Sequence, residues 1–270
     1  MSNPATMTNA IPEGSNLGPL CFSIFINDLP QVLLHTKCTI YADDGAVYAS
    51  GSSKEEVQQQ LNHDLSLIQD WSNNNKIAIN FDKTECMLFH PSYMNEENIT
   101  IKIDNHQIKQ VNKFLYLGVL LDNHLSFNLH YETVCKKVSG RIRLIARHKK
   151  FFDFTYMKIF CTSLILSIVD YSLPIWGYLC NHKIDRLDNL LMKMIECCII
   201  NRSLQFNEKW STLESLNLLT TKERRDVYGL NLVFKHVFQK SFSNCIMTEI
   251  FPRRPITCEM LRERHSHDLD

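Results

Sequence analysis

The sequence predicts an α+β fold, with a first part that mixes short strands and helices and a second part that is helical throughout. Short apolar runs separated by turn residues continue to about residue 121. From about Asn128 onward, the apolar residues recur at helical spacing and strand-like runs disappear. The chain has 270 residues, of which 44% are hydrophobic, so a sizeable core can form.

Two helices are expected in the first part. One runs from about Leu17 to Leu29, where Pro30 ends it, and its apolar residues on most faces predict burial. The other opens at a capping box, Ser53 to Glu56, and ends in the polar run 72–75. Its apolar residues form one core stripe: Val57, Leu61, Leu65, Ile68 and Trp71.

Strands are expected around these helices. Residues 38–41 and 46–49 read as a hairpin whose turn is Asp43-Asp44-Gly45. Alternating or continuous apolar patterns predict further strands at 77–81, 87–89, 99–103, 106–111 and 114–121, with a turn at 104–105. The second part is expected to contain helices at 181–201, 210–218 and 221–238, and a polar tail that frays at 256–270.

The adjacent carboxylates of Asp43 and Asp44 are the most informative feature of the chain. Two neighbouring carboxylates repel each other, whereas a bound divalent cation makes the pair favourable. Oxygen ligands of this kind suit Mg²⁺, which commonly binds one or two carboxylates together with substrate phosphates. An ordinary solvated turn has the same composition, so the pair alone leaves both interpretations open.

Four segments, taken in order, carry a resemblance to one polymerase family. They are similar to motifs B, C, D and E of the reverse transcriptase domain of non-LTR (LINE-type) retrotransposons: Pro12–Pro19, Tyr41–Asp44, Asn80–Thr84 and Phe114–Val119. The likeness continues more loosely to about residue 200. The resemblance implies a partial polymerase palm, an antiparallel sheet with helices, followed by an all-helical thumb-like region.

The resemblance also implies roles for individual residues, with an RNA template and a DNA primer as partners. Asp43 would contact one of two Mg²⁺ ions with Asp44 beside it, and Lys83 would donate a proton to the pyrophosphate. Template and nucleotide contacts would come from Pro12, Gly14, Ser15, Tyr41 and Ala42, and the primer grip from Leu115, Tyr116 and Gly118. Without the resemblance, Lys83 reads as a solvated lysine, Gly14 and Ser15 as a helix cap, and the primer grip as a buried strand.

The resemblance divides the chain into four parts: a non-family extension at 1–10, a partial palm at 11–126, a thumb-like region at 127–202 and a helical C-terminal extension at 203–270. The family carries a further catalytic aspartate upstream of motif B, and residues 1–10 hold no acidic residue. The sequence therefore predicts an N-terminally truncated domain that does not polymerise alone, with a missing N-terminal polymerase half as a candidate partner. Glu13 also departs from the usual glutamine, and Ala10 from the usual glycine.

Charge is balanced overall but not along the chain. The sequence has 29 basic and 29 acidic residues, and the run from Lys136 to Lys150 contains no acidic one. A solvated helix face and a nucleic-acid-facing thumb helix both fit this run, and the preceding polymerase motifs favour the second. The candidate backbone contacts are Lys136, Lys137, Arg141, Arg143, Arg147 and Lys150.

Several classes of site are not indicated. The ten cysteines lack Cys-x-x-Cys spacing, and the pairs His124/His130 and His265/His267 lack neighbouring ligands, so no zinc site is expected. The start of the chain does not resemble a signal peptide, and the longest apolar run, 159–169, is too short to cross a membrane. We therefore expect an intracellular, reducing location, in the cytoplasm or nucleus.

Three functions are compatible with these observations. The first is an RNA-directed DNA polymerase domain whose full-length parent performs metal-dependent nucleotidyl transfer. The second is a catalytically inactive remnant that binds nucleic acid through the basic helix. The third is an interaction module that completes a separate polymerase half through exposed apolar surface.

Overall fold

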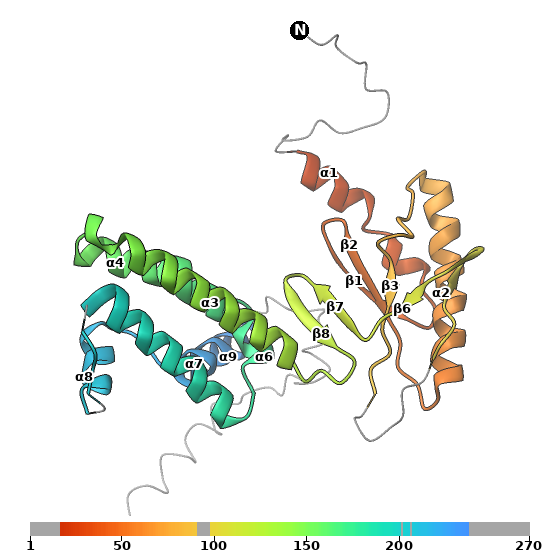
Figure 1. The fold of residues 1–270 in the computed structure, drawn as a ribbon. Coiled ribbons are helices and arrows are strands. Elements are labelled where there is room, and N and C mark those ends of the chain that lie inside the picture. The colour runs from red at the N-terminus through yellow and green to blue at the C-terminus, as the bar shows by residue number, and fades with distance from the viewer. Residues whose placement is uncertain (1–16, 91–97, 201, 206, 238–270) are drawn as a thin grey trace, which may run out of the picture. The chain divides into compact units, whose positions relative to one another are not determined.

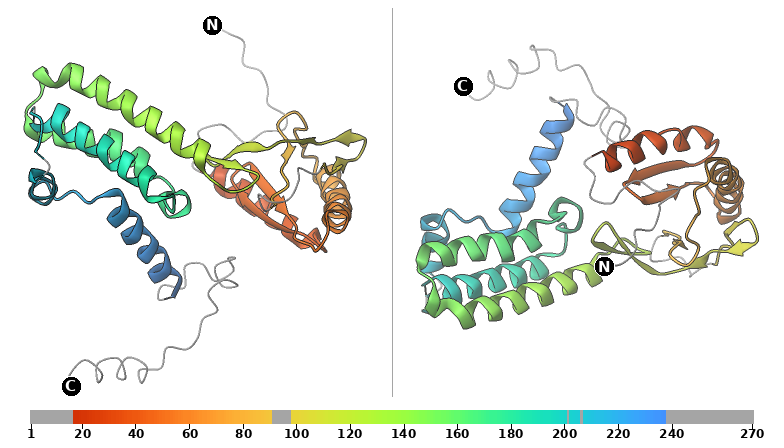
Figure 2. Two further views of the ribbon diagram at one scale, coloured as in Figure 1. Left: turned by 60° about the horizontal axis from the view of Figure 1, so that its bottom comes forward. Right: turned by 90° about the horizontal axis from the view of Figure 1, so that it is seen from above.

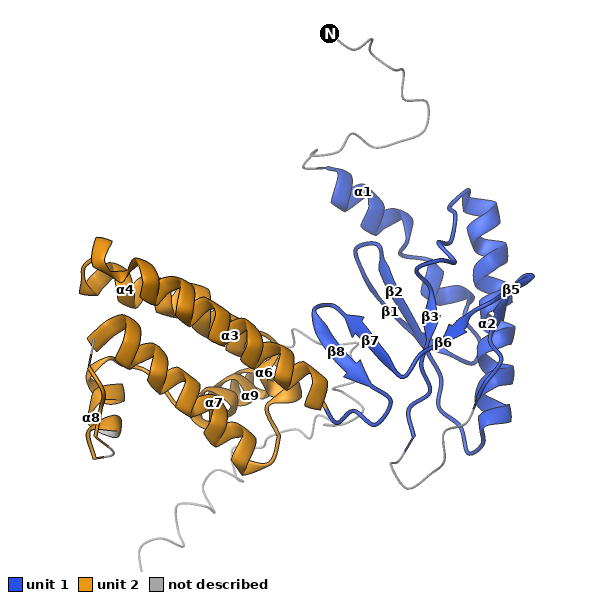
Figure 3. Cartoon of the chain, viewed as in Figure 1, with its two compact units in different colours: residues 1–126 blue, residues 127–270 orange. Residues whose placement is uncertain are grey.

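The structure, a computed structural model, describes residues 17–90, 98–200, 202–205 and 207–237 (Figure 1). The chain divides between Ser126 and Phe127 into two compact units (Figure 3). All described strands belong to unit 1, whereas the described part of unit 2 is helical. This mixture of helices and small sheets agrees with the predicted α+β class. The segment at 1–10, the motif B residues up to Ser15 and the tail at 256–270 lie outside the described residues.

Helix α1 (Gly18–Phe25) is shorter than predicted and precedes a 3₁₀ turn, η1 (Leu29–Val32), which contains Pro30. The prediction that this helix is buried is wrong for the described structure, because Leu20 and Ile24 are 57% and 69% exposed. The cause is limited contact area. Phe25, at the end of α1, packs edge-on against Trp71, with ring centroids 6.1 Å apart, while the preceding turns of the helix have no buried residue.

Strands β1 (Lys37–Tyr41) and β2 (Asp44–Tyr48) form an antiparallel hairpin in which Tyr41 pairs with Asp44. The turn residues are therefore Ala42 and Asp43, and the predicted turn at Asp43-Asp44-Gly45 is wrong. A two-residue turn matches the strand twist when its first residue has positive φ, and Ala42 has φ 52°. Gly45 lies in β2, where an added Cβ would meet nothing within 4 Å.

Helix α2 (Lys54–Asn75) begins and ends where the sequence predicts. The Ser53 hydroxyl caps it by accepting a hydrogen bond from the backbone N–H of Glu56. At the other end, Lys76 takes the left-handed conformation and its N–H donates to the carbonyl of Asn73. Most of the predicted stripe faces the core: Ile68 and Trp71 are buried, and Leu61 and Leu65 pack on the unit 1 isoleucine cluster, Ile99, Ile101, Ile103 and Ile108.

The other strands before residue 111 are shorter than predicted. They are β3 (Glu85–Cys86), β4 (Lys102–Ile103), β5 (His106–Gln107) and β6 (Lys109–Gln110). β4 and β5 pair antiparallel across the predicted turn, whereas β3 and β6 pair in parallel. The predicted strands at 77–81 and 87–89 do not form ladders.

Side chains explain why the segment from Ile99 to Lys102 forms so little ladder. The backbone N–H of Thr100 donates to Gln58 Oε1 at 2.7 Å, and that of Lys102 donates to Asn62 Oδ1 at 2.8 Å. Both acceptors lie on α2. This part of the chain therefore satisfies its backbone against a helix instead of a neighbouring strand.

The apolar run at 114–121 is not one buried strand but a second hairpin, β7 (Lys113–Tyr116) and β8 (Val119–Asp122). Its turn residues, Leu117 and Gly118, have φ 44° and 81°. Two successive positive φ values are those of a type I′ hairpin turn, which reverses the chain within two residues. All described sheets are two-stranded; three of them are antiparallel, as predicted, whereas the pair of β3 and β6 is parallel.

Unit 2 consists of helices that pack around one core. Helices α3 (Asn128–His148), α4 (Phe154–Cys161) and α7 (Asn181–Met194) lie side by side in it (Figure 2). The other helical segments are η2 (Lys149–Phe151), η3 (Thr162–Leu166), α5 (Ser167–Asp170), α6 (Leu173–Trp176), η4 (Ile195–Ile200), α8 (Glu208–Ser215) and α9 (Thr221–Val237). The predicted inward residues of α7 and η4 are all buried: Ile184, Leu187, Leu191, Met194 and Ile195.

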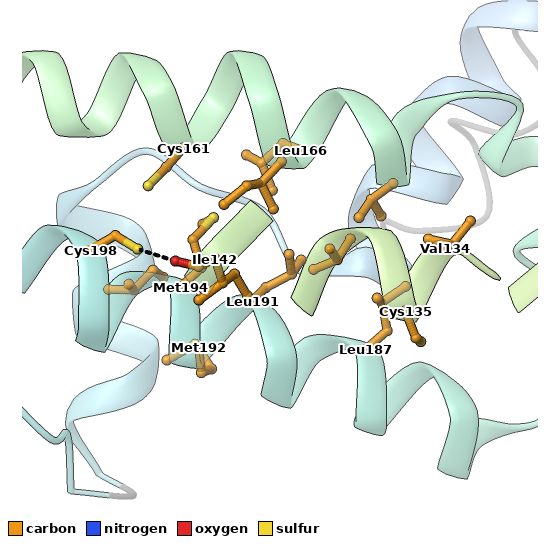
Figure 4. Packing of buried hydrophobic residues seen from close by; sticks show 14 of the residues in the cluster. Val134, Cys135, Ile142, Cys161, Leu166, Leu187, Leu191, Met192, Met194 and Cys198 are labelled. Carbon is orange, nitrogen blue, oxygen red and sulfur yellow. Dashed lines mark hydrogen bonds between the residues drawn. The ribbon is translucent and has the colours of Figure 1, made fainter. Parts of the chain in front are cut away.

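The core of unit 2 is one cluster whose α3 members extend from Tyr131 to Ile145, and Figure 4 shows part of it. Val138 on α3, Leu187 on α7 and Trp176 on α6 are all fully buried. The Trp176 indole N–H donates to the carbonyl of Tyr171 at 2.8 Å, so the polar edge of this large side chain is satisfied. Near the other end, the Cys198 thiol lies 3.7 Å from the carbonyl oxygen of Ile142 (Figure 4).

Two segments of unit 2, η3 and η4, are π-helical. In η3 the side chains bind carbonyl groups of the preceding turn: the Thr162 hydroxyl donates to the carbonyl of Lys158 at 3.0 Å, and that of Ser163 to Ile159 at 2.7 Å. These hydroxyl groups satisfy carbonyls that a widened turn leaves without their usual partners.

Helix α9 is joined to the rest of unit 2 by charged and polar contacts. Arg224 makes a two-pronged ion pair with Asp170 on α5, to which the Tyr228 hydroxyl also donates at 3.0 Å. The backbone N–H of Thr221 donates to Asp188 Oδ1 at 2.8 Å. Among the described residues, no helix combines the length and apolarity needed to cross a bilayer.

Candidate functional site

The carboxylates of Asp43 and Asp44 lie at the end of the β1–β2 hairpin. Asp43 is in the turn and Asp44 begins β2, and both side chains are exposed. The neighbouring Tyr41 is 68% exposed, and Ala42 is also exposed. In the part of the chain that the structure describes, no third histidine, cysteine or carboxylate joins this pair to form a cluster of three. The hairpin therefore presents two adjacent oxygen ligands to solvent.

The segment that leads into β1 is fixed by a buried carboxylate. Asp64, on α2, is fully buried, and its Oδ2 accepts hydrogen bonds from the backbone N–H groups of Leu34, His35 and Thr36 at 3.0, 2.8 and 2.7 Å. The Thr36 hydroxyl donates to the same oxygen at 2.9 Å. This network connects α2 to the residues that immediately precede the β1–β2 hairpin.

The network also determines the charge of Asp64. Burial by itself raises the pKa of a carboxyl group, but hydrogen bonds from His63, His35 and Thr36 outweigh it and hold the pKa of Asp64 well below its usual range. Asp64 is thus a carboxylate at neutral pH. Sequence reasoning did not single it out, although its position between Leu61 and Ile68 places an acidic residue on the apolar stripe of α2.

The second hairpin contacts the first. The hydroxyl groups of Tyr116, on β7, and Thr39, on β1, lie 3.3 Å apart, within hydrogen-bond distance. Of the predicted primer-grip residues, Leu115 is 63% exposed and Tyr116 is half-buried, so they do not form the buried strand that was the alternative interpretation. Gly118 is in the turn, where its positive φ favours glycine.

Lys83 lies in the turn formed by residues 81–83 and is exposed. Its backbone N–H donates to the carbonyl of Asn80 at 3.2 Å, which fixes the turn but not the side chain. Pro12, Gly14 and Ser15, predicted to contact template and nucleotide, lie outside the described residues.

Helix α3 has one buried and one basic face. The buried face carries Val134, Val138, Ile142 and Ile145, among others. The basic side chains outside the buried face are all exposed: Lys136, Lys137, Arg141, Arg143, Arg147 and, just beyond the helix, Lys150. None of these six makes an ion pair with a carboxylate in the described part of the chain. The side chains therefore remain available to an external anion.

Comparison with known proteins identifies a protein family that the first part of the chain resembles. Residues 3–121 match the reverse transcriptase (RNA-dependent DNA polymerase) family. This segment contains the Asp43–Asp44 hairpin, Lys83 and the second hairpin. The first part of the chain is thus similar in sequence to reverse transcriptases.

The individual proteins that resemble this chain come from transposable elements. The chain is 26% identical over 241 residues to the "Probable RNA-directed DNA polymerase from transposon BS" of Drosophila melanogaster, covering 83% of this chain and 26% of that protein. It is 27% identical over 201 residues to the RNA-directed DNA polymerase from mobile element jockey of Drosophila funebris, covering 68% of this chain and 21% of that protein. A Pol polyprotein from type-1 retrotransposable element R1 2 of Nasonia vitripennis is 26% identical over 143 residues, covering 50% of this chain and 35% of that protein.

These relatives are RNA-directed DNA polymerases or a Pol polyprotein of transposable elements, and the chain is similar to them over 143 to 241 residues. The chain spans about a fifth to a third of the length of these three relatives. No solved structure was found to match it.

Proposed function

We propose that the chain supplies the metal-binding hairpin and a nucleic-acid-binding helix of an RNA-directed DNA polymerase. The observation that carries the proposal is the hairpin turn itself, which presents two exposed, adjacent carboxylates inside the reverse transcriptase segment. In this assignment unit 1 is part of a polymerase palm, the helices of 127–202 are thumb-like and residues 203–237 extend them.

The donor set fits a hard divalent cation. Asp43 and Asp44 would hold Mg²⁺ through carboxylate oxygens, because this ion accepts one or two protein carboxylates and completes its shell with water and phosphate. Such an ion supplies activation of the primer 3′-hydroxyl and neutralisation of phosphate charge. Lys83, exposed on its turn, is assigned to protonate the pyrophosphate, and Leu115, Tyr116 and Gly118 to position the primer.

Metal binding by the hairpin can be tested with Mn²⁺ as a paramagnetic probe. We expect Asp43→Asn and Asp44→Asn each to weaken Mn²⁺ binding in the presence of primer–template, by at least about tenfold in dissociation constant. Asp104→Asn is the matched control, because Asp104 is exposed, lies in the same unit and occupies a left-handed turn position that asparagine tolerates. Equal affinity in all three variants would refute the assignment of the carboxylates.

Nucleic-acid binding by α3 can be tested through its salt dependence. Each phosphate neutralised on duplex DNA contributes about 0.9 to the log–log slope of affinity against salt. Replacing Arg141, Arg143 and Arg147 together with alanine should therefore reduce the slope by about 2 to 3. The control removes the same charge from exposed positions elsewhere in unit 2: Lys193, Lys222 and Lys235. An equal change in both triple variants would contradict a specific role of α3.

A second candidate function is nucleic-acid binding without catalysis, which the unpaired cations of α3 favour independently of the carboxylates. Primer extension on an RNA template with Mg²⁺ separates the two candidates. Template-dependent extension that Asp43→Asn abolishes would assign catalysis to this chain. Salt-dependent binding without extension would favour the binding function, and absence of both binding and extension would overturn the proposal.

A further inference from the structure

Three potential metal ligands meet at the base of the β1–β2 hairpin. His35 lies in the segment before β1, and His63 and Asp64 are neighbours on α2. One ligand atom from each residue lies within 4.8 Å of the other two. The three residues are the only such group among the described residues, and they are brought together by folding, since 28 positions separate His35 from His63.

The two oxygens of Asp64 have different surroundings. Oδ2 is occupied by four hydrogen-bond donors, all from the segment Leu34–Thr36. Oδ1 contacts one partner, Nδ1 of His63, at 2.9 Å. The carboxylate is thus held in place through Oδ2. Its Oδ1 faces the Nδ1 atom of the His63 imidazole, which is a potential metal ligand.

The two imidazole rings are adjacent and accessible. Their centroids are 5.0 Å apart, with an interplanar angle of 72°, and both histidines are exposed. The backbone N–H of His35 is bound to Asp64, so the carboxylate that would ligate the ion also holds the second histidine in place. Ions from solvent can reach the rings without a rearrangement of the core.

We propose that His35, His63 and Asp64 form a binding site for one divalent transition-metal ion of the zinc type. Two imidazoles and one carboxylate are a ligand set that zinc uses with a fourth position open to water. Tetrahedral ligands at zinc bond lengths are about 3.4 Å apart. The His63 Nδ1–Asp64 Oδ1 distance of 2.9 Å therefore needs only a small side-chain rotation. Imidazole nitrogen is a poor ligand for Mg²⁺, so this site would select against the cation that suits Asp43 and Asp44.

Binding through Nδ1 of His63 uses the neutral imidazole tautomer that carries its proton on Nε2, because only that form offers the Nδ1 lone pair to the ion. The bound ion would connect α2 directly to the segment preceding β1. The inference does not depend on the polymerase function, because it concerns the base of the hairpin and not its carboxylate turn.

The test is a titration of the full chain with Co²⁺, which reports its coordination by visible absorption, followed by displacement with Zn²⁺. We expect one ion per chain with nitrogen and oxygen ligands. The variants His35→Gln and His63→Gln should each weaken binding at least about tenfold, because each loses one ligand. Both side chains are exposed, and far-ultraviolet circular dichroism verifies that the variants are folded.

The matched control is the double variant His90→Gln/His124→Gln. These rings also form an edge-on pair, with centroids 4.8 Å apart, but without a carboxylate in a three-ligand group. Binding should be unchanged in this control, and Zn²⁺ should raise the unfolding temperature of the native chain but not of His63→Gln. The proposal is overturned by retained binding in both single variants, by a thiolate charge-transfer band that assigns the ion to cysteine, or by no binding up to about 1 mM metal.

Discussion

Replacing Asp64 tests how much of unit 1 depends on one buried carboxylate. Alanine removes the acceptor of four hydrogen bonds. The amide groups of Leu34 and His35 belong to exposed residues and can bind water instead, whereas Thr36 is 8% exposed and its N–H and hydroxyl are left buried. An unsatisfied buried donor costs about 1–3 kcal/mol, so two of them predict a loss of about 2–6 kcal/mol for Asp64→Ala.

Asparagine provides the finer test, because Asp64→Asn keeps one acceptor oxygen for residues 34–36, removes the charge and places an amide NH2 group opposite His63. A charge-assisted hydrogen bond exceeds a neutral one by about 1 kcal/mol, so the two buried bonds predict a loss of about 2 kcal/mol. Native-state hydrogen exchange measures this loss directly at the amides of residues 34–36. Asp70→Asn is the control, since Asp70 is exposed on the same helix and carries the same charge. Equal exchange at 34–36 in both variants would refute the reasoning.

Three further predictions concern unit 2. Gly177→Ala places a Cβ 2.5 Å from the carbonyl oxygen of Leu173, so the urea midpoint should drop by the equivalent of about 2–3 kcal/mol, and an unchanged midpoint would contradict the packing described for α6. Gly140→Ala, inside α3 with nothing within 4 Å of its Cβ, should instead raise stability by about 1 kcal/mol. Burial and the nearby charge of Lys137 lower the pKa of His130, so below about pH 6.5 the unfolded chain binds a proton that the folded one excludes. Stability should therefore fall as pH decreases through this value, and His130→Gln should flatten the dependence.

Local signals in the sequence predicted the helices of the chain well. The Ser53 cap, the stop after Asn75 and the change to helical period near Asn128 all appear in the structure. Each of these depends on residues within one or two turns of the feature, and the core stripe of α7 follows from spacing alone. The class of protein was also predictable, because the motifs lie in order within the segment that the family comparison matches.

Features that depend on distant contacts were not predictable. Whether α1 is buried depends on what packs over it, and most of it is exposed. The predicted strand at 99–103 is reduced to β4 because Gln58 and Asn62 on α2 bind its backbone. The hairpin turn at Leu117–Gly118 could not be predicted, because it lies within a continuous apolar run and leucine does not indicate a positive φ. The group of His35, His63 and Asp64 requires two segments to meet, and no spacing rule joins them.

The π-helical segments give unit 2 two places where chain length can vary. A π turn is an α-helix with one residue inserted, and the flanking turns keep their phase because the widened turn absorbs the extra residue. Deleting Ser163 from η3 would return this turn to α-helical geometry and leave the buried Ile165 and Leu166 on their original face. The same deletion in the middle of α3 would rotate every following side chain by about 100° and expose its buried stripe. Insertions and deletions, which a helical core ordinarily excludes, should therefore be tolerated first at η3 and η4.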